Sequence, residues 1–239
     1  MIFVNISVIY GTTRKTCTYN CVQMLLNNLK LTIPINVKEF FLEKEVPNYF
    51  DEFFLCYING EIIYPNSNPI DYLTNSLDNS DLIILASPVI QCDTTTELNS
   101  LLNLLFFKSI EYNTQSFMNT KIGLVMSTTS GAGLSHTTNN LKKNLFFWGI
   151  HNVFRFSKTL YEIDWEDVSL RTKIKINKRI FKLSNKILDI YLNSSTKNTV
   201  SNKTIDYKFE PTLKNKYNNI LNVNFRKKHI YAHNTRKIH

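Results

Sequence analysis

The sequence lacks several features that mark common functional classes. It has only four cysteines in 239 residues and no Cys-x-x-Cys pair, so we expect neither a disulfide framework nor a metal centre. No apolar run approaches the ~20 residues that are needed to span a bilayer. Residues 1–5 contain neither a basic region nor a cleavage site, so we predict a cytoplasmic protein without a signal peptide.

The common nucleotide-binding signatures are also missing. There is no P-loop and no Gly-x-Gly-x-x-Gly, which argues against an ATP site or a Rossmann dinucleotide site. Instead, the apolar run at residues 6–10 ends at Gly11, and Thr12, Thr13 and Arg14 lead into a predicted helix. Hydroxyl and guanidinium donors beside a helix N-terminus are typical of a phosphate site. An ordinary polar turn is the alternative, and this loop alone does not decide between them.

Charge is distributed unequally along the chain. Residues 171–239 contain 17 Lys and Arg against 3 Asp and Glu, whereas residues 1–170 contain 11 against 16. A basic C-terminal part of this kind can bind nucleic acid or anionic lipid. A solvated helix face with a Lys- and Asn-rich tail explains the same pattern. We favour this explanation and do not expect a nucleic-acid partner.

Apolar periodicity predicts alternating strands and helices over most of the chain. This alternation indicates an α/β fold with a doubly wound, five-stranded parallel sheet and helices on both faces. The polar segment at 192–204 predicts a linker, and hence a domain at 1–191 followed by a basic C-terminal extension at 192–239. The expected strands are 2–10, 35–41, 81–86, 121–127 and 152–156, and the expected helices are 18–29, 69–77, 95–106, 134–148 and 165–191.

Polar or turn-forming loops follow three of these strands. They lie at 11–18, 86–91 and 127–134. Ligands of doubly wound sheets bind beyond the carboxyl ends of the strands, so the three loops should meet at one site. Gly131 and Gly133 would let the backbone approach a flat ring closely. The combination favours a ligand site over three ordinary turns.

These loops resemble those of the flavodoxin-like NAD(P)H-dependent FMN oxidoreductase family. The similarity covers roughly residues 1–190 and includes a phosphate loop, a flavin loop and a Gly-rich loop before a helix that ends in Phe-Trp-Gly. The resemblance implies a flavodoxin-like fold, non-covalent FMN, and NADPH or NADH as the electron donor. It also implies hydride transfer through FMN to a quinone-like or other small acceptor, and often a homodimer. The matching stretches are Gly11-Thr12-Thr13-Arg14-Lys15 with Thr18, Ala86-Ser87-Pro88-Val89, Thr128-Thr129-Ser130-Gly131-Ala132-Gly133-Leu134 and Phe147-Trp148-Gly149.

The resemblance implies one group of FMN-binding residues in each loop. No catalytic side chain is implied, because the flavin supplies the chemistry and the protein supplies position and electrostatics. The phosphate group consists of Thr12, Thr13, Arg14, Thr18 and Asn20. The ring-lining group is Ser87, Pro88, Val89 and Ile90, and the group at the other edge of the ring is Thr129, Gly131 and Gly133.

The sequence departs from the family pattern at several positions. Ile90 stands where the family has a tyrosine, and Asn99 and Asn103 stand where it usually has Lys and Asp. Cys56 is the only thiol in the segment where many relatives carry a cysteine cluster, so we expect no iron–sulfur centre. The aromatic segment at 49–64 would cap the flavin or a substrate, or, as is more common for such a segment, pack on its own body or on a second subunit. We expect a homodimer.

Three classes of function remain. The first is the FMN-dependent oxidoreductase, which is our prediction. The second is a flavodoxin-fold protein with weakened or lost FMN binding that acts as a structural or interaction module, and Ile90, Asn99 and Asn103 favour it. The third is a surface-binding module that uses the basic C-terminal part. No aromatic stacking pattern accompanies that part, which disfavours nucleic acid.

Overall fold

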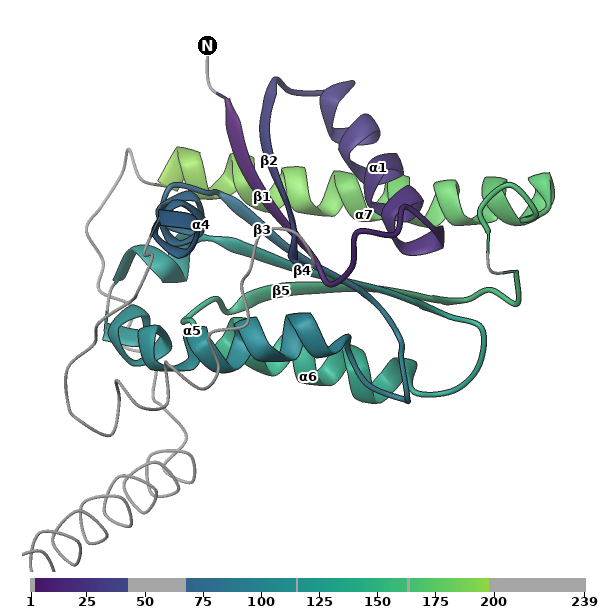
Figure 1. Ribbon diagram of the computed structural model, residues 1–239. Coiled ribbons are helices and arrows are strands. Elements are labelled where there is room, and N and C mark those ends of the chain that lie inside the picture. The colour runs from purple at the N-terminus through teal and green to yellow at the C-terminus, as the bar shows by residue number, and fades with distance from the viewer. Residues whose placement is uncertain (1–2, 43–67, 115, 163, 198–239) are drawn as a thin grey trace, which may run out of the picture. The chain divides into compact units, whose positions relative to one another are not determined.

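The computed structural model describes residues 3–42, 68–114, 116–162 and 164–197 (Figure 1). Strands and helices alternate along the chain, as the apolar periodicity predicts. The strands are β1 (Val4–Tyr10), β2 (Ile35–Phe41), β3 (Leu82–Pro88), β4 (Ile122–Thr129) and β5 (Asn152–Thr159). The helices are α1 (Cys17–Lys30), α4 (Asn68–Asp78), α5 (Thr96–Thr114), α6 (Leu134–Phe147) and α7 (Leu170–Lys197), and a short 3-10 helix, η1, spans Ser116–Thr120.

All five strands are parallel and form one sheet in the order β2-β1-β3-β4-β5. The chain leaves β1 for β2 at one edge and then returns to place β3 on the other side of β1. The strand order therefore reverses between β1 and β3, which is where a doubly wound sheet binds its ligands. The predicted fold class is confirmed for the described residues.

The sheet divides the core into two layers. Figure 1 shows α1 and α7 on one side of the sheet, with α5 and α6 on the other. Alternate strand residues serve the two layers: Ile84 packs in the cluster with α1 and α7, whereas Ile83 and Leu85 pack in the cluster with α4, α5 and α6. Because β3 is buried on both faces, it reads as a continuous apolar run. Each fully buried Leu or Ile stabilises the fold by about 1.5–3 kcal/mol.

The last helix differs from its expected bounds at both ends. Residues 165–168 form a turn, in which the N–H of Val168 donates to the carbonyl of Trp165 at 3.2 Å. The Ser169 hydroxyl then accepts the N–H of Thr172 at 3.4 Å, as an N-cap residue does, so the helix starts at Leu170. The helix continues to Lys197, so six residues of the expected linker are helical.

Two predictions from the sequence fall outside the described residues. The division into 1–191 and 192–239 stays a prediction, because residues 198–239 are not described. The aromatic segment at 49–64 and Cys56 also lie outside the described ranges. Among the helices that are described, none is long and apolar enough to cross a membrane.

Candidate functional site

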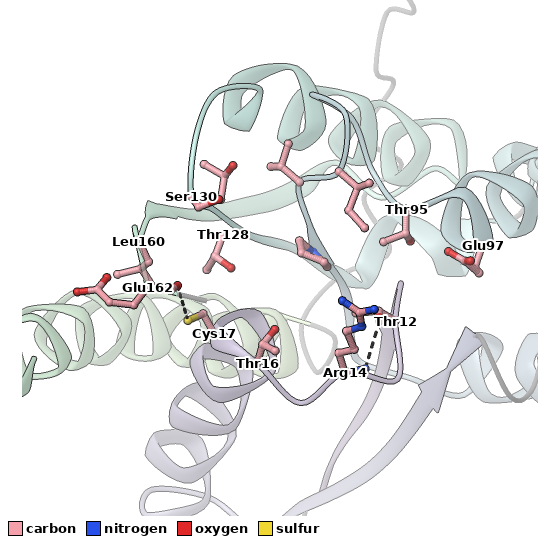
Figure 2. A pocket seen from close by; sticks show the side chains of 14 residues that line it. Thr12, Arg14, Thr16, Cys17, Thr95, Glu97, Thr128, Ser130, Leu160 and Glu162 are labelled. Carbon is pink, nitrogen blue, oxygen red and sulfur yellow. Dashed lines mark hydrogen bonds between the residues drawn. The ribbon is translucent and has the colours of Figure 1, made fainter. Parts of the chain in front are cut away.

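A cavity of about 430 Å³ lies at the carboxyl ends of the strands (Figure 2). Its walls come from the β1–α1, β3–α5, β4–α6 and β5–α7 loops, with the first turns of α1 and α5 at its edge. The lining residues are Thr12, Arg14, Thr16, Cys17, Pro88, Val89, Ile90, Thr95, Glu97, Thr128, Thr129, Ser130, Leu160 and Glu162.

One end of the cavity is formed by the β1–α1 loop and the start of α1. Thr16 is the N-cap residue of α1, and its side chain makes no capping hydrogen bond. The first turn of a helix presents backbone N–H groups and the positive end of the helix dipole. The Thr12 hydroxyl accepts the backbone N–H of Arg14 at 3.2 Å, which folds the loop back, and Figure 2 shows the Arg14 side chain beside Thr12 at the cavity wall. This end of the cavity therefore suits an anionic group.

Two acidic side chains also line the cavity, and Figure 2 shows them on opposite sides of it. Glu162, from the β5–α7 loop, and Glu97, from the first turn of α5, both line the cavity. The Cys17 thiol donates to the backbone carbonyl of Glu162 at 3.7 Å. Burial, and then the negative charges of Glu162 and Asp164, raise the pKa of the Cys17 thiol, so it stays neutral at pH 7. The cavity lining therefore includes one guanidinium and two carboxyl groups.

The opposite wall is built by a tight turn in the β3–α5 loop. Pro88, Val89 and Ile90 line the cavity and lead into this turn. The backbones of Ile90 and Asp93 exchange hydrogen bonds of 2.8 and 2.9 Å. The two residues between them, Gln91 and Cys92, have positive φ angles of 50° and 63°. Such paired left-handed residues are uncommon outside Gly, Asn and Asp, and they are found where the surrounding structure holds them in place.

The β4–α6 loop supplies that support. A Cβ atom on Gly133, whose φ is +97°, would lie 2.6 Å from the Cα of Cys92, so the two loops can touch only because residue 133 is glycine. One carboxylate oxygen of Asp93 accepts the N–H of Thr94 at 2.7 Å and the amide of Asn140, on α6, at 3.2 Å. The β3–α5 loop is therefore held by direct contacts with the β4–α6 loop and with α6.

Six of the residues implied by the family resemblance line the cavity, and six do not. Three of the residues outside the lining form hydrogen bonds with residues that do line the cavity. The buried Thr18 hydroxyl pairs with that of Thr128 at 2.7 Å, and the Asn20 amide donates to the Thr16 carbonyl at 3.0 Å. The Ser87 hydroxyl donates to the Pro88 carbonyl at 2.8 Å. The lining residues are Thr12, Arg14, Pro88, Val89, Ile90 and Thr129, and the others are Thr13, Thr18, Asn20, Ser87, Gly131 and Gly133.

Sequence reasoning missed part of the lining, above all the contribution of β5. The expected strand ended at residue 156, but β5 continues to Thr159, and the N–H of Leu160 still donates to the Thr129 carbonyl at 2.8 Å. Leu160 and Glu162 therefore reach the cavity from a fourth strand end. The polar residues 157–159 hid this extension, because three consecutive polar residues at a strand end look like the start of a loop. The other lining residues that were missed are Thr16, Cys17, Thr95, Glu97, Thr128 and Ser130.

The chain matches a model of a known protein family. The family model for NADPH-dependent FMN reductase matches residues 4–159, which include all five strands. A search of curated proteins gives no significant match.

Several solved structures are similar to the chain in fold. One is an FMN-dependent NADH-azoreductase from Bacillus anthracis in complex with FMN, with a TM-score of 0.56 and 11% identity over 78% of this chain and 99% of that chain. A second is an apo NADH:FMN oxidoreductase (EMOB), with a TM-score of 0.54 and 18% identity over 75% and 88% of the two chains. A third, the NAD(P)H:(acceptor) oxidoreductase FerB from Paracoccus denitrificans, has a TM-score of 0.52 and 14% identity over 79% and 97%.

Proposed function

Because the chain belongs to the NADPH-dependent FMN reductase family, whose cofactors are FMN and a nicotinamide nucleotide, we propose that it is an FMN-dependent NAD(P)H oxidoreductase that reduces a quinone-like or other small acceptor. The observation that carries the proposal is the position of the cavity. It lies at the carboxyl ends of the strands, where the N-terminus of α1 and Arg14 meet two loops with apolar lining residues.

The residues present fit FMN. The cavity volume of about 430 Å³ lies within the range that is typical of cofactor sites. Thr12, Arg14 and Thr16 form a polar end that suits a phosphate. Val89 and Ile90 form an apolar wall, and Ile90 is 51% exposed at the cavity, so it can cover a flat ring.

In this proposal the chain binds and orients the cofactor. Arg14, the Thr12 hydroxyl and the first-turn N–H groups of α1 would hold the phosphate through charge-assisted hydrogen bonds. Pro88, Val89 and Ile90 would pack on the ring and exclude water from that side. Bound FMN would supply the chemistry, taking a hydride from NAD(P)H and passing it to the acceptor.

Flavin titration of the Arg14→Ala variant tests the proposal. Loss of one charge-assisted contact costs about 1.5–3 kcal/mol, so the FMN dissociation constant should rise roughly tenfold to a hundredfold. Lys15→Ala is the matched control, because the Lys15 ammonium lies over the Tyr19 ring at 5.4 Å and does not line the cavity. Full FMN affinity in Arg14→Ala, or equal losses in both variants, would overturn the phosphate assignment.

The second candidate is a flavodoxin-fold protein with weak or no FMN binding that acts as a structural or interaction module. The two carboxyl groups that share the cavity with Arg14 favour it, because they repel a phosphate. The colour of the purified protein separates the two functions. A yellow protein with a flavin spectrum supports the oxidoreductase, and a colourless protein that does not bind added FMN supports the alternative.

We further propose a cytoplasmic homodimer, as the cysteine pattern and the family resemblance predict. Light scattering at micromolar concentration measures the assembly directly. A mass near 27.9 kDa would indicate a monomer and contradict the dimer.

A further inference from the structure

Helix α7 presents a row of cations on the side that faces away from the core. Its inner side is buried, with Ile176, Ile180 and Ile187 almost completely covered. At 100° per residue, the exposed cations fall on the opposite side and extend over about 23 Å of helix. We call this row the cationic face, and it consists of Arg171, Lys175, Lys178, Lys182 and Lys186.

These cations do not take part in holding the fold together. Within the part of the chain that the structure describes, no carboxyl oxygen lies within 4 Å of a cationic-face nitrogen. Two other cations of α7 do make intramolecular contacts: the Lys173 ammonium lies 5.3 Å from the Trp165 ring centre, and the Arg179 guanidinium lies 5.2 Å from that of Phe156. The cationic face is therefore available to a negatively charged partner.

Large apolar side chains lie beside the cationic face. Leu170, Ile174 and Phe181 are 73%, 48% and 50% exposed. Their spacing of four and seven residues puts them on one stripe of the helix, next to Lys178. A stripe of exposed apolar residues flanked by Lys and Arg is typical of helices that lie in the interface of an anionic membrane.

We propose that the outward side of α7 binds an anionic lipid surface. The cationic face would contact the head groups, and Leu170, Ile174 and Phe181 would enter the boundary with the acyl chains. A nucleic acid would also attract the cations, but it offers no partner for the aliphatic Leu170 and Ile174, so the apolar stripe favours lipid.

Helix α7 is also connected in sequence to the cavity lining. Helix α7 begins a few residues after Leu160 and Glu162, which line the cavity, and Figure 1 shows its first turns at the end of the sheet where the strands finish. The start of the proposed lipid-binding helix therefore follows directly in sequence from two residues of the cavity lining.

Vesicle sedimentation with the full chain tests the proposal. We expect stronger binding to phosphatidylcholine vesicles that contain phosphatidylserine than to phosphatidylcholine alone, and weaker binding as salt rises. Each cation near such a surface contributes about fivefold to binding, so Lys178→Gln with Lys182→Gln should weaken it roughly 25-fold. Lys142→Gln with Lys143→Gln, on α6 beyond the opposite face of the sheet, is the matched control and should change binding less than about twofold.

A second pair of variants separates lipid from nucleic acid. Ile174→Ser with Phe181→Ser should weaken vesicle binding about tenfold or more and leave duplex-DNA binding unchanged. Thermal melting checks that every variant is folded. Equal binding to both vesicle types, equal losses in the α6 and α7 lysine pairs, or DNA binding that alone depends on Lys178 and Lys182 would each overturn the proposal.

Discussion

The two ends of the parallel sheet use polar side chains in different ways. At the amino ends of the strands, the buried Lys121 ammonium donates to the carbonyls of Asp78 and Ser80, both at 2.7 Å. Burial lowers the pKa of Lys121, and the charges of Asp81 and Asp78 oppose that shift. At the carboxyl ends, Arg14 and Ser130 are exposed and line a cavity.

The hydrogen bonds around these residues also differ between the two ends of the sheet. Near the amino ends, the Ser7 hydroxyl pairs with those of Ser76 and Ser80 at 2.6 and 2.7 Å, and the Asn5 N–H donates to Asp81 at 2.8 Å. Polar groups that bond to one another stabilise the fold and have little capacity left for a ligand. The polar groups at the amino ends are therefore largely bonded within the fold, whereas Arg14 and Ser130 at the carboxyl ends remain exposed at the cavity.

Lys121→Ala tests the stabilising end and has the largest expected effect. The substitution leaves two carbonyl groups without their donor in a buried place, so the free energy of unfolding should fall by about 2–4 kcal/mol. Urea denaturation measures this change, with the exposed Lys143→Ala as the control. FMN affinity of the folded protein should stay the same. If Lys121→Ala instead lost FMN binding and kept its stability, Lys121 would serve the ligand and not the fold, which contradicts the contrast between the two ends.

Gly133→Ala tests the contact between the two loops at the ligand end. A methyl group at this positive φ must displace the backbone of Cys92, which should cost about 1–3 kcal/mol of stability and weaken FMN binding. Gly131→Ala is the matched control, because no atom lies within 4 Å of its added Cβ. Thermal melting and flavin titration measure the two effects. If both variants behave alike, the loops do not support each other.

Glu162→Gln should strengthen FMN binding. Removing a negative charge from the cavity wall reduces repulsion of the phosphate, and for a partly exposed carboxyl group we expect a gain of about threefold at low salt. Glu166→Gln, in the same loop but outside the cavity lining, is the control. The gain should shrink as salt rises. Unchanged or weaker binding in Glu162→Gln would show that this carboxyl group does not face the phosphate.

Cysteine labelling compares the exposed turn of the β3–α5 loop with the buried first turns of α1 at little cost to the fold. Cys92 is exposed, whereas Cys17 and Cys21 are buried, and burial raises the pKa of Cys21 to about 12. At pH 8, Cys92→Ser should therefore remove one fast-reacting thiol, and Cys21→Ser should leave the fast phase unchanged. Stopped-flow labelling with a disulfide reagent counts these thiols. A fast phase that disappears in Cys21→Ser would place that thiol at the surface.

Most of the fold could be predicted from the sequence because its signals are local. The buried β3 reads as an apolar run, and the helices show apolar residues at helical spacing. The start of α7 was missed because Trp165 and Val168 extend the apolar pattern into a turn, and only the Ser169 hydroxyl bond marks the true boundary.

The candidate site was harder to predict because it depends on contacts between loops. Thr12, Arg14, Val89 and Ile90 come from loops that the order of motifs singles out, and they line one cavity because parallel strands bring their carboxyl ends together. Nothing local shows that the amide of Asn140 reaches Asp93, 47 positions away in the sequence. The role of the implied residues in binding FMN stays a prediction.

The strand order also has a consequence for synthesis of the chain. β1 pairs with β2 soon after both are made, but its other partner, β3, begins at Leu82, some 41 residues after the end of β2 at Phe41. At about 5–20 residues per second, the ribosome takes roughly 2–8 s to make that interval. During this time one edge of β1 has unpaired backbone N–H and C=O groups, so the nascent chain passes through a period in which aggregation competes with folding.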